Sequence, residues 1–280
     1  MSSLKTKKIS NIRGATIYRG DLGLFDRIPA WILTLVTFVL FLLIWEGVCR
    51  LGWVSPLLVP RPTTIGMALS DGLFSRGTYW VHIRSTTLIA LCGFVIAGFL
   101  GIAVASFLSM SARIEEIIYP YIVAFQTLPK VALAPLIVIW AGFGNTSKLI
   151  IVVIVSFFPI FMSTLQGLRV RDRDQYQYLQ TLGATRIQIL FNLRLPAAAP
   201  HIFSGLHIGV LFSLIGAIVA EFVGSDSGLG YVLLLDKSAF NVPGVFAILT
   251  LLVVIGTVFN LAMRFVESRI AFWARDLSVR

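Results

Sequence analysis

The chain has 280 residues, of which 57% are hydrophobic and only 13% charged, and its formal net charge is +10. A soluble chain carries roughly 45–50% apolar and about 25% charged residues, so this one has too little charge to cover a soluble surface. The composition excludes a soluble enzyme and a disordered tail protein. The two cysteines provide neither a disulfide framework nor a metal-type spacing. The sequence therefore predicts an all-α integral membrane protein.

The first 27 residues are basic, with six Lys or Arg residues and no acidic residue before Asp21. Lys and Arg accumulate on the cytoplasmic side of membrane proteins, which explains this charge without a nucleic-acid partner. A charge-free run follows over residues 28–45. It is too long for a signal-peptide core, and no small-residue cleavage site follows it. We expect 1–27 to be a cytoplasmic segment and the run to be an uncleaved first span.

Four later charge-free runs are each long enough to cross a bilayer, for which a helix needs about 20 residues. They cover residues 85–112, 149–168, 195–220 and 238–263. Small side chains recur at every fourth position of the 85–112 run and predict close packing against another helix backbone. They are Gly93, Ala97, Gly101 and Ala105.

The region between 113 and 147 is ambiguous, because Lys130 interrupts its apolar run. Taken as one helix, residues 117–141 would rise about 37 Å, enough for a tilted span, and its three prolines would kink it. One span here makes six in total. Splitting it would place the five arginines of the 169–196 loop outside, against the positive-inside rule. We predict a six-span domain over 28–268 and a cytoplasmic tail over 269–280.

The loop 169–196 has the signals of two short helices. Asp172 and Asp174 suit a helix start, and Gly183 can end that helix in a left-handed conformation. Thr185 can cap a second helix, and Pro196 suits the first position of the fifth span. The sequence predicts a helix–turn–helix whose apolar residues Leu182, Ile187 and Leu190 no bilayer buries.

An exposed apolar face beside a membrane indicates a protein partner. One alternative is a DNA-reading helix–turn–helix, but that needs an independent domain, which a loop tethered at both ends to membrane spans does not supply. The other alternative is a loop that packs on its own membrane domain.

The loop resembles a known motif. Gly183, nine further residues, and then Leu193, Leu195 and Pro196 match part of the "EAA" loop of bacterial ABC importer permeases. Gln177 stands where the motif has Glu. The resemblance implies that the loop docks on a cytoplasmic ATPase. The expected coupling residues are Gln177, Leu182, Gly183, Ala184, Ile187, Leu190, Leu193, Leu195 and Pro196.

Three further segments resemble the nitrate/sulfonate/taurine branch of these permeases: 58–62, 128–148 and 220–231. The resemblance covers roughly residues 30–275. It implies a type I ABC importer permease fold in the bacterial inner membrane, with both termini cytoplasmic. The implied partners are a second permease copy, two ATPase subunits and a periplasmic or lipid-anchored binding protein.

The chain lacks a Gly-x-x-x-x-Gly-Lys-Ser/Thr phosphate-binding loop, so it cannot bind ATP in that manner. We expect ATP and Mg²⁺ on the partner ATPase, no cofactor in this chain, and no catalytic or metal site. The histidines are scattered, with His201 and His207 six residues apart and therefore not on one helix face. The rival class, a stand-alone secondary transporter or channel, would move solute without an ATPase.

Lys130 is the main candidate for the pathway. A charge inside a span costs about 2.5–3.5 kcal/mol on insertion scales and usually faces the bundle interior or water. We expect Lys130, preceded by Phe125, Gln126 and Thr127, to favour a small anionic solute resembling nitrate, sulfonate, taurine or bicarbonate. The alternative solute is neutral or aromatic, such as a pyrimidine precursor. Glu221 is the other ionisable residue at depth and a further pathway candidate. The structural alternative is an ion pair of Lys130 with Glu221.

The segment 222–243 has three glycines that allow a tight fold near the outer face. There Asp226 and Asp236 are expected to meet the binding protein. The alternative is that 222–243 is an ordinary solvated connector. The contact with the binding protein would then lie elsewhere, in the 54–84 loop.

Overall fold

The computed structural model describes residues 29–169 and 173–271, and every regular element in these ranges is a helix. The predicted all-α fold is confirmed. The chain divides into two compact units, Met1–Thr63 and Thr64–Arg280, which we describe separately. The predictions for residues 1–27, for most of 269–280 and for Asp172 concern residues outside the described ranges.

The first unit contains helix α1 (Ala30–Arg50). Only 6% of its apolar window is buried, and side chains such as Leu43, at 64% exposure, point away from protein. A helix that is apolar on all sides and has little protein cover is suited to lipid.

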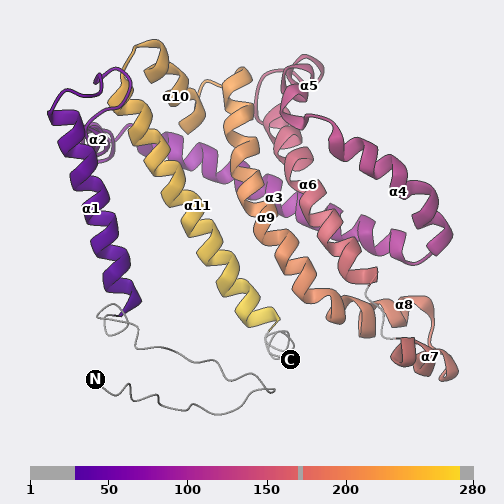
Figure 1. The fold of residues 1–280 in the computed structure, drawn as a ribbon. Coiled ribbons are helices and arrows are strands. Elements are labelled where there is room, and N and C mark those ends of the chain that lie inside the picture. The colour runs from indigo at the N-terminus through magenta and orange to yellow at the C-terminus, as the bar shows by residue number, and fades with distance from the viewer. Residues whose placement is uncertain (1–28, 170–172, 272–280) are drawn as a thin grey trace, which may run out of the picture. The chain divides into compact units, whose positions relative to one another are not determined.

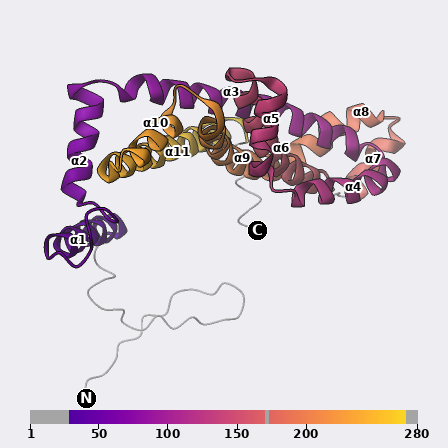
Figure 2. The same ribbon diagram turned by 90° about the horizontal axis from the view of Figure 1, so that it is seen from above.

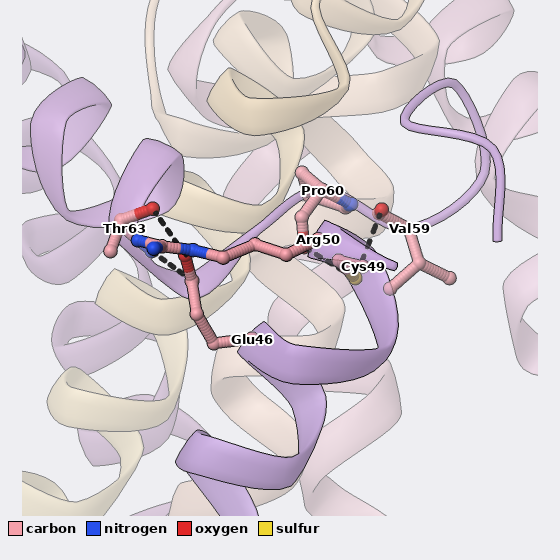
Figure 3. A network of polar contacts seen from close by, with 6 residues as sticks. All are labelled: Glu46, Cys49, Arg50, Val59, Pro60 and Thr63. Atoms are coloured by element: carbon pink, nitrogen blue, oxygen red, sulfur yellow. Dashed lines mark hydrogen bonds and ion pairs between the residues drawn. The ribbon is translucent and has the colours of Figure 1, made fainter. Parts of the chain in front are cut away.

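A polar network closes the end of α1 (Figure 3). The Glu46 carboxylate accepts hydrogen bonds from Arg50 Nε at 2.8 Å and from Thr63 Oγ1 at 3.1 Å. The Cys49 thiol lies 3.7 Å from the Val59 carbonyl oxygen. These contacts fold the connection after α1 back onto the helix end.

The second unit is a bundle whose centre is formed by three long helices, α3 (Tyr79–Ser109), α6 (Asn145–Arg169) and α9 (Leu195–Gly224). The remaining elements are α2 (Pro62–Ser70), η2 (Asp71–Ser75), α4 (Ala112–Thr127), η3 (Lys130–Leu133), α5 (Ala134–Ala141), α7 (Arg173–Thr181), α8 (Arg186–Ile189), η4 (Leu190–Arg194), α10 (Leu229–Ser238) and α11 (Val242–Ile270).

Helices α3 and α6 approach closely along the predicted small-residue stripe. A Cβ at Gly93 would overlap the Val152 side chain, and a Cβ at Gly101 would lie 3.2 Å from the Phe161 backbone nitrogen. Ala97 and Ala105 are fully buried. The stripe therefore packs helix against helix, as predicted.

The third span is broken. Helix α4 ends at Thr127, and the following pair η3–α5 is bent by 78° from it. Leu128 is extended, with φ −63° and ψ 134°, because a residue before proline is pushed out of the helical region. The prolines were expected to kink the helix over 117–141, and the structure breaks it between Thr127 and Lys130. Counted as one broken span, the segment brings the candidate spans to six by length and composition.

The bundle has two different ends. In Figure 1, α5 and α10 lie at one end of α6 and α9, and α7 and α8 lie at the other. Figures 1 and 2 both place the start of α4 beside the α7–α8 end. This arrangement separates two groups of functional residues by the length of α9.

Candidate functional site

The predicted loop turn is present. Gly183 has φ +79°, and its N–H donates to the Gln180 carbonyl at 3.0 Å while Ala184 N–H donates to Leu179 at 3.1 Å. Such bonds satisfy the last carbonyls of a helix when the residue after it is left-handed. The sequence prediction of a glycine break after the first short helix is confirmed.

Thr185 caps the second short helix as predicted. Gln188 N–H donates to Thr185 Oγ1 at 3.3 Å, and Thr185 N–H donates to Gln188 Oε1 at 2.8 Å. This reciprocal capping box satisfies two backbone donors that a helix start leaves open. Local bonds therefore fix the turn between α7 and α8.

The tip of this loop carries exposed apolar side chains. Tyr178 and Leu182 are each 65% exposed, Phe191 is 63% and Ile187 is 59% exposed. We call these four residues the apolar tip. Gln177 and Gly183 are also exposed, and Ala184, Leu193, Leu195 and Pro196 are half-buried.

The prediction that Leu190 is exposed was wrong. It is 6% exposed and belongs to the core cluster that joins α3, α6 and α9. Helical spacing places Leu190 beside Ile187, but Leu190 packs on the membrane domain. This part of the loop therefore agrees with the alternative stated above, in which the loop packs on its own membrane domain. Only the tip is left for a partner.

Two arginines anchor the loop at its ends. Arg194 Nη1 donates to the Ser109 carbonyl at the end of α3 at 2.8 Å, and its guanidinium lies 5.2 Å from the Tyr176 ring. Arg169, the last residue of α6, forms an ion pair with Glu115 and lies 4.4 Å from the Tyr119 ring, both on α4. The loop is thereby attached to the third span as well as to α3.

Pro196 does not open a separate helix. The helical run is continuous from Arg186 to Gly224, and a π-helical segment, η4, precedes the proline. Proline cannot donate the usual bond four residues back, and a π-bulge is a common way to accommodate such a defect. Pro196 thus stands in the first turn of α9, as predicted, but α8 and η4 continue into this helix without a gap.

Lys130 stands at the break of the third span. Its ammonium donates to the Gln126 carbonyl at 3.2 Å and lies 4.6 Å from the centre of the Phe158 ring on α6. Phe125, Gln126 and Thr127 are exposed around it. The backbone here is irregular, which is tolerated at membrane depth where it is buried in protein or lines a cavity.

Glu221 is bonded elsewhere and not to Lys130. It is 1% exposed. Its Oε1 accepts from Thr86 Oγ1 at 2.8 Å, and its Oε2 accepts from Gly230 N–H at 2.7 Å. The anticipated ion pair between Lys130 and Glu221 is absent from the bonds within the described ranges.

Glu221 is part of a buried network that holds the start of α10. Leu229 N–H donates to Thr86 Oγ1 at 2.8 Å, and Gly228 N–H donates to His82 Nδ1 at 3.0 Å. Side chains of α3 and α9 therefore accept the first three amide protons of this helix. A Cβ at Gly228 would overlap the Glu221 carboxylate, which explains the glycine.

The two predicted outer carboxylates differ. Asp226 is exposed. Asp236 is half-buried, and its Oδ1 accepts from Asn241 Nδ2 at 2.9 Å. Asn241 in turn accepts from Gly244 N–H at 3.3 Å and caps α11. Asp236 thus holds the corner between α10 and α11, whereas Asp226 remains available to a partner.

Sequence reasoning missed a polar cluster between α9 and α11. His207 lies 3.1 Å from Asn260 Oδ1 and 2.9 Å from Glu267 Oε2. Arg264 lines the same cavity of about 460 Å³. The spacing of 260, 264 and 267 places them on one helix face, and this signal could have revealed the α11 half. No group of three or more potential metal ligands occurs among the residues that the structure describes.

Comparison with known proteins identifies the family. Residues 97–272 match the model of the binding-protein-dependent transport system inner membrane component. The chain is 34% identical over 238 residues to the formylaminopyrimidine transport permease protein ThiX of Halalkalibacterium halodurans, covering 85% of this chain and 94% of the relative. It is 29% identical to the taurine transport system permease protein TauC of Escherichia coli, covering 86% and 89% respectively.

A solved structure shares the fold. A chain of the methionine ABC transporter MetNI, in an inward-facing conformation, aligns with a TM-score of 0.57 at 18% identity. The alignment covers 67% of this chain and 94% of that chain. The type I importer permease fold predicted above is confirmed. With the six candidate spans and the family match, the chain belongs to the binding-protein-dependent transport system inner membrane components, as a multi-pass ABC transporter permease.

Proposed function

We propose that the chain forms the translocation pathway of an ATP-driven importer, in which two permease copies act with two ATPase subunits and a binding protein. ATP and Mg²⁺ bind the ATPase subunits, and this chain holds no cofactor. The observation that carries the proposal is the apolar tip, which is exposed although the base of the same loop is anchored by Arg194 and buried Leu190. An exposed apolar surface at the end of a membrane bundle indicates binding to a groove on another protein.

The charge distribution supports an orientation with both termini in the cytoplasm. Arg169, Arg186 and Arg194 flank the apolar tip, which fits the positive-inside rule. In this orientation the α7–α8 end faces the cytoplasmic ATPase, and the α10 end faces the binding protein. Of the two predicted binding-protein contacts, exposed Asp226 is the better candidate, because Asp236 is bonded within its own corner.

The proposed solute is small and carries an acidic group, with Lys130 on its pathway. The ammonium has three N–H groups, and the structure shows one hydrogen bond to Gln126. A second candidate, a neutral heteroaromatic solute, is favoured by the 34% identity to ThiX, whose name refers to a formylaminopyrimidine.

The test of the coupling surface is Gly183→Asp in the assembled transporter. It places a charge on the apolar tip, so we expect the ATPase to be lost during copurification while the permease stays in the membrane. Gly52→Asp is a matched control, because Gly52 has φ +74° and, like Gly183, no atom within 4 Å of an added Cβ. Full ATPase retention in Gly183→Asp would contradict the docking assignment.

The test of the solute class is Lys130→Met with Lys237→Met as control, since Lys237 is an exposed lysine on α10. We expect uptake of a sulfonate to fall and ATPase assembly to persist. If Lys130→Met lowers sulfonate uptake no more than Lys237→Met does, Lys130 does not select the anion. If the wild-type transporter takes up an aminopyrimidine and no sulfonate, the heteroaromatic candidate is correct.

A further inference from the structure

A cavity of about 400 Å³ lies at the α10 end of the bundle, between the start of α6 and the end of α9. Its lining residues are Phe143, Gly144, Lys148, Gly224, Ser225 and Asp226. The volume falls within the range of small-molecule pockets, roughly 300–1,000 Å³. Lys130 and Glu221 of the proposed pathway do not line it, so it is a separate site.

Lys148 is an unusual residue for this place. It lines the cavity but is only 3% exposed. Among the bonds of the described ranges, none joins its ammonium to another residue. It also lies in the first turn of α6, where the helix dipole disfavours a positive charge. A buried cation in such a position is stable only when negative groups offset it.

Glu221 supplies one such group, and among the hydrogen bonds of the described residues none joins it to the ammonium. The Glu221 carboxylate attracts Lys148 through space. Both Glu221 oxygens, however, already accept hydrogen bonds, from Thr86 and from the start of α10. Glu221 therefore offsets the charge of Lys148 without taking up its N–H donors.

Asp226 places an opposite charge on the wall of the same cavity. It is exposed, and its turn is held because Ser227 N–H donates to Ser225 Oγ at 3.2 Å. A simple anion that approached Lys148 would be repelled by Asp226 and Glu221. A simple cation would be repelled by Lys148. A solute that carries both charges meets complementary groups on both sides.

We propose that this cavity binds a small zwitterion, with its carboxylate or sulfonate against Lys148 and its ammonium against Asp226. The inference deepens the proposed function and rests on it, since the cavity would receive the solute at the α10 end before it reaches Lys130. Its test measures binding to the permease alone, and therefore does not depend on transport.

The experiment uses the full-length permease in lipid nanodiscs and ligand-detected saturation-transfer NMR, with empty nanodiscs as blank. The probes are taurine, ethanesulfonate, which lacks the amine, and ethanolamine, which lacks the acid. We expect taurine to bind about tenfold or more tightly than either single-charge probe, because each charged contact contributes at this level.

Two variants assign the contacts. Lys148→Met should weaken taurine binding about tenfold or more, and Asp226→Asn should reduce taurine to the level of ethanesulfonate. Since Lys148 is buried and its removal could unfold the protein, exposed Asp226 supplies the safer variant. Lys237→Met is the control for losing a positive charge at the same end.

The outcomes separate the two proposals. Equal binding of the three probes, or taurine binding that neither variant changes, would overturn the zwitterion site. Absence of taurine binding to a permease whose complex still imports solute would also overturn it and leave the proposed function intact. Taurine binding with the expected variant effects, in a complex that imports nothing, would instead support the site and contradict the proposed function.

Discussion

Short helices lie at both ends of α9, and the backbone polar groups at their termini are satisfied differently at the two ends. At the α7–α8 end, the turn around Gly183 and Thr185 is satisfied by its own backbone and by Gln188. At the α10 end, the first amide protons are accepted by His82 and Thr86 of α3, which are 146 and 143 positions away, and by Glu221 of the preceding helix, nine positions away.

The difference shows what each end is free to do. A turn that is locally satisfied needs no cover, so the apolar tip can stay exposed for another protein. A helix start that depends on distant side chains is fixed to the bundle and cannot leave without stranding buried polar groups. The α7–α8 end therefore presents an exposed surface, whereas the start of α10 is bonded to buried side chains of the bundle.

The largest expected effect is at Gly228. Gly228→Ala combines a disfavoured backbone conformation, φ +113°, with overlap of the new Cβ and the Glu221 carboxylate. We expect a loss of roughly 2–6 kcal/mol in stability, as the sum of strain and overpacking. Thermal unfolding in detergent measures it. Gly142→Ala is the control, because φ is +78° there and nothing lies within 4 Å; equal shifts would mean that the overlap is unimportant.

Next come the two leucines of the loop, which should separate stability from docking. Leu190→Ala empties a buried site and should destabilise the permease by about 2–5 kcal/mol. Leu182, at 65% exposure, should change stability by less than about 0.5 kcal/mol when replaced by Ala, yet weaken ATPase copurification. A Leu182→Ala variant that melts early but retains the ATPase would show that the tip is structural.

A smaller effect is expected at Thr86, whose hydroxyl joins Glu221 to the start of α10. Thr86→Val keeps the shape and removes both bonds, which should cost about 1–3 kcal/mol. Thr164→Val is the matched control, since Thr164 is fully buried and its hydroxyl has no hydrogen-bond partner in the described structure. If the two valine variants melt at the same temperature, the network at α10 does not stabilise the fold.

Local chemistry made the α7–α8 turn predictable. The bonds at this turn join residues three to five positions apart, so Gly183 and Thr185 could be assigned from the sequence. The burial of Leu190 could not be predicted in this way. Periodicity identifies an apolar face, but it does not show which part of that face the same chain covers. Pro129 signalled a kink, but a proline alone does not specify a bend of 78°.

The polar clusters were harder to predict because their partners are distant. Thr86 and Glu221 are 135 positions apart, and His207 and Glu267 are 60 apart. Such contacts follow from which helices are neighbours, and hydropathy does not specify that. Arg264 and Glu267 follow the last charge-free run, where charged residues are expected at the membrane surface, so nothing in their position indicates a contact with His207.

The helical run from Arg186 to Gly224 has 39 residues, but it is not a straight rod. The π-helical segment η4 and Pro196 interrupt its regular hydrogen bonding, and helices bend at such places. Figure 1 shows the run turning where η4 meets α9, so that α8 lies across the foot of α9. A force on Ile187 of the apolar tip would therefore act at an angle to α9 and would tilt or rotate it. Because Glu221, which holds α10, and Gly224, which lines the Lys148 cavity, belong to α9, that movement would reach the opposite side of the membrane.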